Sequence, residues 1–132
     1  MSGHMFFADR YHGFDDALYA ACRLIEIVAN SGNALSAQTD GLPLTITTPE
    51  LRVDCADDCK FAIVEKVKAH FQAIRPCNDI DGVRVKFDHG WGLVRASNTQ
   101  PILVLRFEAD TQANLDAYRA EVEAAVEAAK RA

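Results

Sequence analysis

The residue types best suited to binding chemistry gather in one short polar segment, Arg95 to Pro101, with the sequence RASNTQP. The guanidinium of Arg95 is a planar, permanently charged fork of N–H donors that matches the oxygens of a phosphate or a carboxylate. Ser97, Asn98 and Thr99 add short neutral donors, and a tight turn would bring successive backbone N–H groups onto one concave side. The segment is a candidate anion-binding loop. The same residue types are common in ordinary connections between strands, so composition leaves both interpretations open.

Strands are predicted on both sides of this loop, from Trp91 to Val94 and from Ile102 to Phe107. The second run is almost entirely apolar over residues 102–105, which is typical of a strand inside a sheet rather than at its edge. Upstream, Val83, Val85 and Phe87 alternate with charged residues, as in a strand with one buried face. A hairpin turn over residues 88–90 joins that strand to the next.

Helical spacing predicts three helices. The first covers residues 14–29, and the second follows a short strand over 51–54, with Asp54 or Cys55 as its cap, and ends before Pro76. The third begins at a Thr111 cap. The expected apolar stripes are Phe61, Val64, Val67, Phe71 and Ile74 for the second helix, and Leu115, Tyr118, Val122, Val126 and Ala129 for the third.

The resulting order is a helix, a linker and then βαβββα, which predicts an α+β fold. We expect an antiparallel four-stranded sheet with helices on one face. The composition changes to Ser, Asn, Gly, Thr and Pro from Ser31 to Pro49, so a domain boundary is expected there.

Charge and composition exclude several classes of function. The net charge of -5 and the pI near 5.3 argue against nucleic acid or an anionic membrane as a partner. No apolar run approaches the ~20 residues that a membrane helix needs, so a cytoplasmic protein is expected. The four cysteines and four histidines show no metal-site spacing, and we predict no metal site and reduced, structural thiols.

Longer stretches resemble a known family. DGVRVKF and GWGLVRASNTQPILVLRFEAD are similar to the C-terminal domain of the α-D-phosphohexomutases, of the bacterial phosphomannomutase/phosphoglucomutase type. MSGHMFF followed by RYHGFDDALYAACRLIEI resembles the sugar-recognition loop and last helix of that family's third domain. The two matches follow the family's order and together cover nearly the whole sequence.

This resemblance implies a fold, a domain division and a reaction. The fold would be the TATA-binding-protein-like fourth domain of the family, preceded by an extra helix and a linker. Residues 1–30 would be the remnant of domain 3, residues 31–48 a linker, and residues 49–132 a phosphate-binding domain. The implied reaction interconverts hexose 1- and 6-phosphates, of mannose or glucose, by phosphoryl transfer through a phosphoserine and a bisphosphate intermediate.

The resemblance also assigns residues. Arg95, Ser97, Asn98 and Thr99 match residues that hold the substrate phosphate not undergoing reaction. Ser2 matches a contact to a sugar hydroxyl, and His4 matches a histidine near the reacting phosphate that is a candidate acid or base.

The family's phosphoserine loop and its aspartate-rich Mg²⁺ motif are absent from these 132 residues. We therefore expect no cofactor in this chain, Mg²⁺ in the full-length enzyme, and no mutase activity from the chain alone. The missing N-terminal domains of the same enzyme are its expected partners. The alternatives are a free-standing sugar-phosphate-binding module and a module that self-associates through helix 14–29, which has lost the sheet it covers in the family.

Overall fold

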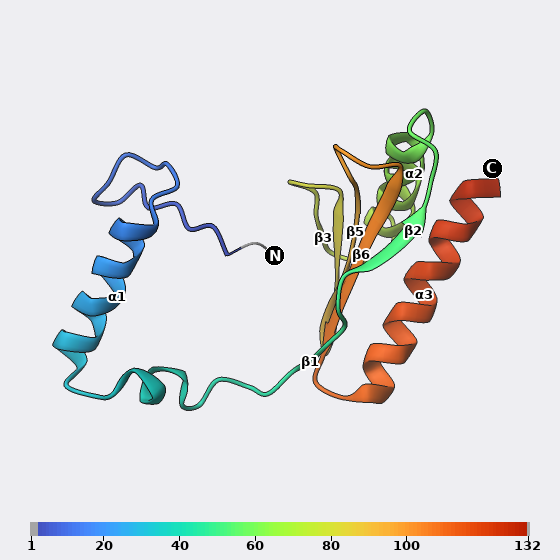
Figure 1. Ribbon diagram of the computed structural model, residues 1–132. Coiled ribbons are helices and arrows are strands. Elements are labelled where there is room, and N and C mark those ends of the chain that lie inside the picture. The colour runs from blue at the N-terminus through green and yellow to red at the C-terminus, as the bar shows by residue number, and fades with distance from the viewer. Residues whose placement is uncertain (1–2, 132) are drawn as a thin grey trace. The chain divides into compact units, whose positions relative to one another are not determined.

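The computed structural model describes residues 3–131 (Figure 1). Its contacts divide the chain between Leu42 and Pro43 into two compact units. The N-terminal unit contains the helix α1, Ala17–Ser31, and the short 3-10 helix Leu35–Thr39. Helix α1 starts three residues later than predicted because the Asp16 carboxylate caps it by accepting the Tyr19 N–H at 2.9 Å. It ends at Ser31, two residues beyond the predicted end, and Gly32 follows it in the left-handed conformation.

The C-terminal unit is built on a six-stranded antiparallel sheet. Its order is β1-β6-β5-β4-β3, with β2 also pairing with β6. The strands are β1 (Ile46–Thr47), β2 (Leu51–Asp54), β3 (Cys77–Asn78), β4 (Val83–Phe87), β5 (Gly90–Ala96) and β6 (Ile102–Ala109). The four predicted strands are present. The structure adds β1 and β3, which are too short for their sequence to show a period of two.

Both helices of this unit, α2 (Lys60–Gln72) and α3 (Gln112–Arg131), lie on the same side of the sheet (Figure 1). Val83, Val85 and Phe87 point toward them and are buried, which confirms the predicted alternation in β4. The core is completed by β5, by β6 and by the helices, where Phe71 and Phe107 have no exposed surface. The α+β prediction with helices on one face is confirmed.

The start and the buried stripe of α2 differ from the prediction. The helix begins at Lys60, and neither Asp54 nor Cys55 caps it, because residues 57–59 form a turn. The predicted core positions Phe61 and Ile74 are more than half exposed, and Ile63 is buried instead. The stripe of α3 lies as predicted, with Thr111 Oγ1 accepting the N–H of Asn114 at 3.3 Å.

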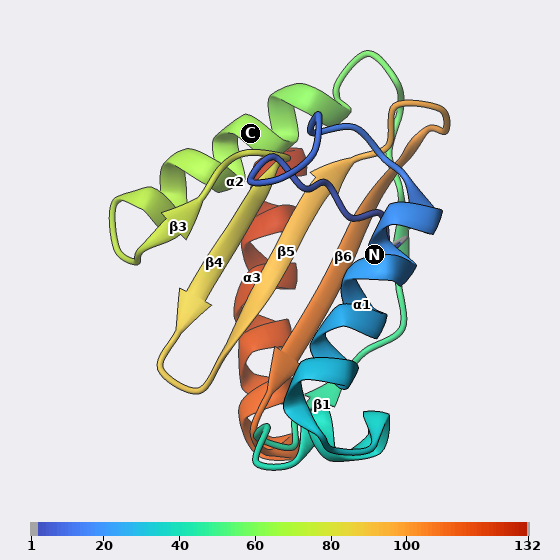
Figure 2. The same cartoon turned by 90° about the vertical axis from the view of Figure 1, so that its left-hand side faces the viewer.

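The other face of the sheet carries no helix of this unit and is visible in Figure 2, with α2 and α3 behind the strands. Since alternate residues of a strand point to opposite faces, this open face receives Arg84, Lys86, Trp91, Arg95 and Arg106, together with the acid Glu108. The Arg84 guanidinium lies 4.4 Å from the Trp91 ring centroid. The open face therefore concentrates positive charge on an acidic chain. Across residues 3–131, the structure contains no helix long and apolar enough to cross a membrane.

Candidate functional site

Arg95 lies near the end of β5, on the open face of the sheet. Pairing with β6 places it opposite Val104, and Val104 is in turn opposite Arg52 of β2. The Arg95 side chain is one third exposed, so its base is held by the sheet while its guanidinium can reach solvent. The hairpin between β5 and β6 carries the rest of the candidate loop at the same end of these strands (Figure 2).

Ser97 organises the loop through its hydroxyl oxygen. The Thr99 and Gln100 N–H groups donate to Ser97 Oγ at 3.3 and 3.1 Å, and the Ser97 N–H donates to the Ile102 carbonyl at 3.1 Å. Ser97 is buried, whereas Asn98 and Thr99 are exposed. The predicted role of Ser97 as a donor is compatible with this arrangement, because the hydroxyl proton is not used when the oxygen accepts.

Asp81 is the acidic neighbour of Arg95, and the sequence analysis did not identify it. Its Oδ2 lies 3.8 Å from Arg95 Nη1, and its side chain is 68% exposed. The adjacent Gly82 has φ of 73°, and a Cβ there would approach the Arg95 Cα to 2.8 Å and collide with the Val94 carbonyl. Only glycine lets the strand start this close to β5. The Asp-Gly pair before β4 was the signal available in the sequence.

The segment between β2 and α2, together with the first residue of α2, forms hydrogen bonds to the candidate loop. The Lys60 ammonium is buried, donates to the Gln100 carbonyl at 3.1 Å and pairs with Asp57 Oδ1 at 2.6 Å. The Cys55 N–H donates to the Pro101 carbonyl at 2.9 Å. Lys60 was also missed, since a buried lysine on a helix has the same sequence signature as an exposed one.

His4 belongs to the N-terminal unit. Its Nε2 lies 3.4 Å from Asp15 Oδ2, and an isolated bridge pairs Phe6 with Asp15. Both side chains are about half exposed. The described segment before α1, residues 3–16, is called the first loop. His4 and Asp15 line a hollow of about 600 Å³ between this loop and α1, together with Met5, Ala20 and Arg23. Ser2, the predicted sugar contact, lies outside the described residues.

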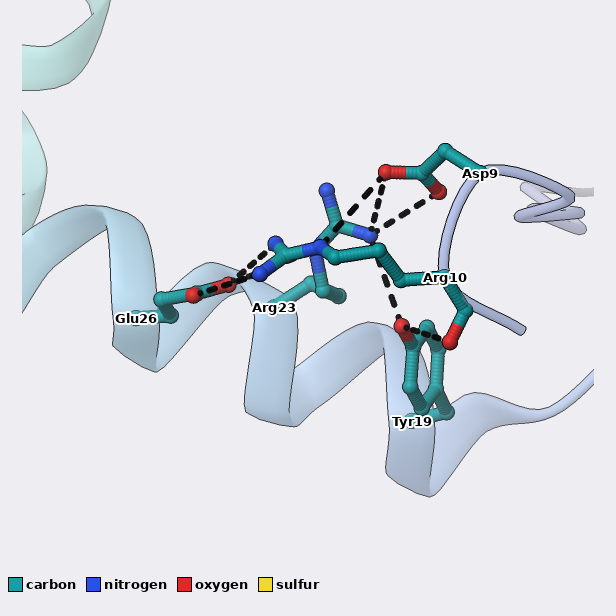
Figure 3. Close-up of polar contacts among 5 residues, drawn as sticks. All are labelled: Asp9, Arg10, Tyr19, Arg23 and Glu26. Carbon is teal, nitrogen blue, oxygen red and sulfur yellow. Dashed lines mark hydrogen bonds and ion pairs between the residues drawn. The ribbon is translucent and has the colours of Figure 1, made fainter.

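A network of charged residues fixes that first loop to α1 (Figure 3). The Arg23 Nη1 atom donates to both oxygens of Asp9 at 3.0 Å, and Arg10 forms a two-bond fork with Glu26 at 3.0 and 2.7 Å. The Tyr19 hydroxyl donates to the Arg10 carbonyl at 3.1 Å. Arg23 also lies over the Phe7 ring, 4.8 Å from its centroid. The loop that carries His4 is thus attached to α1 at several points.

The network lowers the pKa values of its acids. The hydrogen bond from Arg23 holds the pKa of Asp9 below its usual range, and Arg10 does the same for Glu26. The hydroxyl of Tyr11 donates to Asp16 at 2.6 Å and, with the Tyr19 N–H, lowers the pKa of that carboxyl. These groups are at the surface, so their interactions are screened by solvent and salt.

Among residues 3–131, the acids do not gather into a Mg²⁺ site. The Asp16 carboxylate is occupied by Tyr11 and the helix cap, and Asp57 is paired with Lys60. Within residues 3–131, no group of three or more His, Cys, Asp or Glu side chains is placed to hold a metal ion.

Two models of protein families match the chain. A family model described as phosphoglucomutase/phosphomannomutase, C-terminal domain, matches residues 50–125. The chain belongs to the phosphoglucomutase/phosphomannomutase family. The model of alpha/beta/alpha domain III of the same family matches residues 1–45. The resemblance inferred from the sequence is confirmed for both parts of the chain.

Individual proteins named as phosphoglucomutases or phosphomannomutases are also similar to the chain. A phosphoglucomutase of Neisseria gonorrhoeae is 48% identical over 130 residues, which cover 96% of this chain and 28% of that protein. A phosphomannomutase/phosphoglucomutase of Pseudomonas aeruginosa is 47% identical over 117 residues, covering 88% of this chain and 25% of that protein.

A crystal structure of a phosphoglucomutase/phosphomannomutase family protein from Burkholderia thailandensis matches with a TM-score of 0.78 and 42% identity. That match covers 98% of this chain and 27% of the solved one. The chain therefore spans about a quarter of the length of these family members.

Proposed function

We propose that this chain is the substrate-phosphate-binding portion of a phosphomannomutase/phosphoglucomutase. The whole enzyme would interconvert hexose 1- and 6-phosphates of mannose or glucose, using a phosphoserine and a bisphosphate intermediate. The observation that carries the proposal is Arg95, held by the sheet beside a loop organised by Ser97, with a long ion pair to an exposed aspartate. The match to two successive domains of the family favours this over a free-standing binding module.

The loop is suited to holding a phosphate that does not react. An exposed ion pair such as Arg95 with Asp81 contributes only about 0–1 kcal/mol, so a dianionic phosphate can replace Asp81 at little cost. Asn98 and Thr99 are exposed and able to donate to the other phosphate oxygens, and the Ser97 hydroxyl proton can do the same. Because the bonds form at a surface loop, the phosphate remains exchangeable.

The residues of the N-terminal unit would act on the sugar. We assign Ser2 to a sugar hydroxyl and His4 to proton transfer near the reacting phosphate, with Asp15 beside its imidazole. We also assign residues 1–30 to the end of domain 3, residues 31–48 to a linker and residues 49–132 to the phosphate-binding domain.

Mg²⁺ would serve the whole, cytoplasmic enzyme from its other domains, where it would stabilise charge on the transferred phosphoryl group. The acids described above do not supply its ligands. The partners of this chain are then the hexose phosphate and the upstream domains of the same enzyme.

Titration of the chain with glucose 6-phosphate or mannose 1-phosphate tests the binding role. We expect amide shifts of Ser97, Asn98 and Thr99 that saturate at millimolar ligand, and larger shifts than with glucose or mannose alone. The absence of shifts at these residues would remove the loop as an autonomous phosphate site.

Assay of the purified chain for mutase turnover tests the assignment as a portion of an enzyme. We expect no turnover above a mock-purified control, because we assign the phosphoserine and the metal site to the upstream domains. Turnover that co-purifies with the chain and disappears in an Arg95→Ala variant would contradict this.

Self-association is a second candidate property, favoured by the surface of α1. Leu18 and Ile25 on this helix are 82% and 67% exposed, and Ala20 is its only described residue that is buried. Large apolar side chains that are exposed together on one helix are usually covered by another protein surface. We propose that the missing part of domain 3 covers them in the whole enzyme, and that a second copy covers them in the isolated chain.

A further inference from the structure

Two cysteines lie in contact beside the candidate phosphate loop. The Sγ atoms of Cys55 and Cys59 are 3.8 Å apart. Cys55 directly follows β2 and is buried, and Cys59 is the residue before α2 and is partly exposed. A disulfide bond requires the sulfur atoms to close to about 2.05 Å, which demands a modest movement of the turn between them.

The other two cysteines provide an internal comparison. Cys22 is exposed on α1 in the other unit, and Cys77 lies in β3, where its thiol is directed to the Arg75 carbonyl at 3.5 Å. All four are free thiols, and Cys55 with Cys59 is the one pair of sulfur atoms in contact among residues 3–131.

The two thiols differ in solvent accessibility and therefore in the order in which they would react. Burial, and then the neighbouring Cys59, raises the pKa of the Cys55 thiol, so Cys55 is the poorer first nucleophile. Cys59 has the more exposed side chain and meets a solvent-borne oxidant first. This is the arrangement of an attacking and a resolving cysteine.

We propose that Cys55 and Cys59 form a redox-active dithiol that closes to an intramolecular disulfide. The oxidant is a small disulfide such as oxidised glutathione. The Cys59 thiolate attacks one glutathione sulfur and releases the first glutathione thiolate. Cys55 then loses its proton to solvent and attacks Cys59 Sγ, which releases the second glutathione. Two protein thiols and one glutathione disulfide become one protein disulfide and two glutathione thiols.

Closure of this disulfide reaches the phosphate loop through two contacts. The Cys55 N–H donates to the Pro101 carbonyl, and Lys60, next to Cys59, donates to the Gln100 carbonyl. Any movement that brings the two sulfur atoms together therefore pulls on both attachments of the loop. The modified state differs from the reduced one at residues 97–101 as well as at the cysteines.

Digestion with trypsin makes the proposal measurable, because cleavage after Arg52 and Lys60 leaves both thiols in one peptide, VDCADDCK. The native chain is incubated with oxidised glutathione, and remaining thiols are alkylated before digestion. We expect this peptide to lose two hydrogen masses and to resist alkylation, while the peptides with Cys22 and Cys77 are alkylated or carry glutathione. Reduction should restore the thiols.

Matched variants separate the two steps. A Cys55→Ser variant should stop at a stable glutathione adduct on Cys59, and a Cys59→Ser variant should resist modification at Cys55. Amide spectra of the oxidised native chain should show shifts at Gln100 and its neighbours. The proposal is overturned if both thiols of the native chain remain alkylatable, or if glutathione stays on Cys59 with Cys55 intact. No sugar phosphate is present, so the outcome is independent of the proposed function.

Discussion

At the scale of single residues, the candidate site depends on how weakly Arg95 is held before a ligand arrives. Its ion pair with Asp81 is 3.8 Å long and two thirds of the Asp81 side chain is exposed, so the pair stabilises the fold very little. The guanidinium is nevertheless directed by β5 and by the close approach of Gly82. A positive charge that the fold positions but pairs only weakly is preorganised to bind an anion.

Replacement of Arg95 by alanine should weaken sugar-phosphate binding without unfolding the domain. We expect a loss of about 1.5–3 kcal/mol, the range for a charge-assisted hydrogen bond, or roughly a tenfold to hundredfold higher Kd. Amide titrations with glucose 6-phosphate give the affinity. Arg119→Ala on α3 removes an equal charge from an exposed pair with Glu123 and is the control. Equal affinities of the two variants would count against the site.

Replacement of Ser97 by alanine should affect stability as well as binding. Two backbone N–H groups lose their acceptor, which we expect to cost about 0.5–1.5 kcal/mol for each bond. Hydrogen exchange at Thr99 and Gln100 and urea unfolding measure this loss. Asn98→Ala, at an exposed position, should reduce binding and leave the unfolding midpoint unchanged. If Ser97→Ala leaves exchange at these amides unaltered, Ser97 does not organise the loop.

At the scale of elements, the first loop depends on charged contacts where the sheet depends on apolar packing. Asp9, Arg10, Arg23 and Glu26 attach the loop to α1, and α1 buries only Ala20. The strands and helices of the C-terminal unit share a core of fully buried side chains. The two parts should therefore respond differently to acid.

Acid should unfold the N-terminal unit at a higher pH than the C-terminal unit. The pKa values of Asp9, Asp16 and Glu26 are lowered in the folded chain. Their stabilising effect is complete above the unfolded pKa of about 4 and is lost as the pH falls through the lower folded pKa values. Amide signals of α1 should then disappear before those of β5 and β6 in a titration to about pH 2.

A double change of Asp9→Asn and Glu26→Gln checks the origin of this acid sensitivity. It should destabilise α1 at neutral pH and flatten the pH dependence below pH 5, because the titrating partners are gone. Asp40→Asn, at an exposed position after the 3-10 helix, is the matched control. Simultaneous loss of both units in the native chain would contradict the prediction.

Elements whose hydrophobic pattern repeats several times could be predicted from the sequence, whereas single tertiary contacts between side chains could not. The alternation in β4 and the stripe of α3 were predicted because each repeats over several residues. The predicted start of α2 was wrong because residues 57–59 form a turn, and Lys60, the first helical residue, binds Asp57 of that turn and the distant Gln100. Asp81 and Lys60 were missed for the same reason, since their partners are distant in sequence.

At the scale of the whole molecule, helix α1 presents exposed apolar side chains that no described residue covers. The chain spans about a quarter of the length of its relatives, and the match to domain III ends at residue 45. We proposed above that the rest of domain III covers this helix in the whole enzyme. In the chain alone, Leu18 and Ile25 are left exposed, and burying each in an interface would contribute about 1.5–3 kcal/mol.

The isolated chain should therefore associate through α1 in a concentration-dependent manner, and Leu18→Glu should shift it toward the monomer in sedimentation velocity. Because Leu18 is 82% exposed, its replacement removes little packing within the chain, so helix content by circular dichroism should be unchanged. Ile80→Glu introduces the same charge at an 88% exposed position of the C-terminal unit and should leave association unaltered.

Equal effects of both variants would indicate general charge repulsion, and a native chain that stays monomeric at high concentration would contradict the interface. A chain that associates while its Ser97 to Thr99 amides still respond to sugar phosphate would establish that the two surfaces act independently.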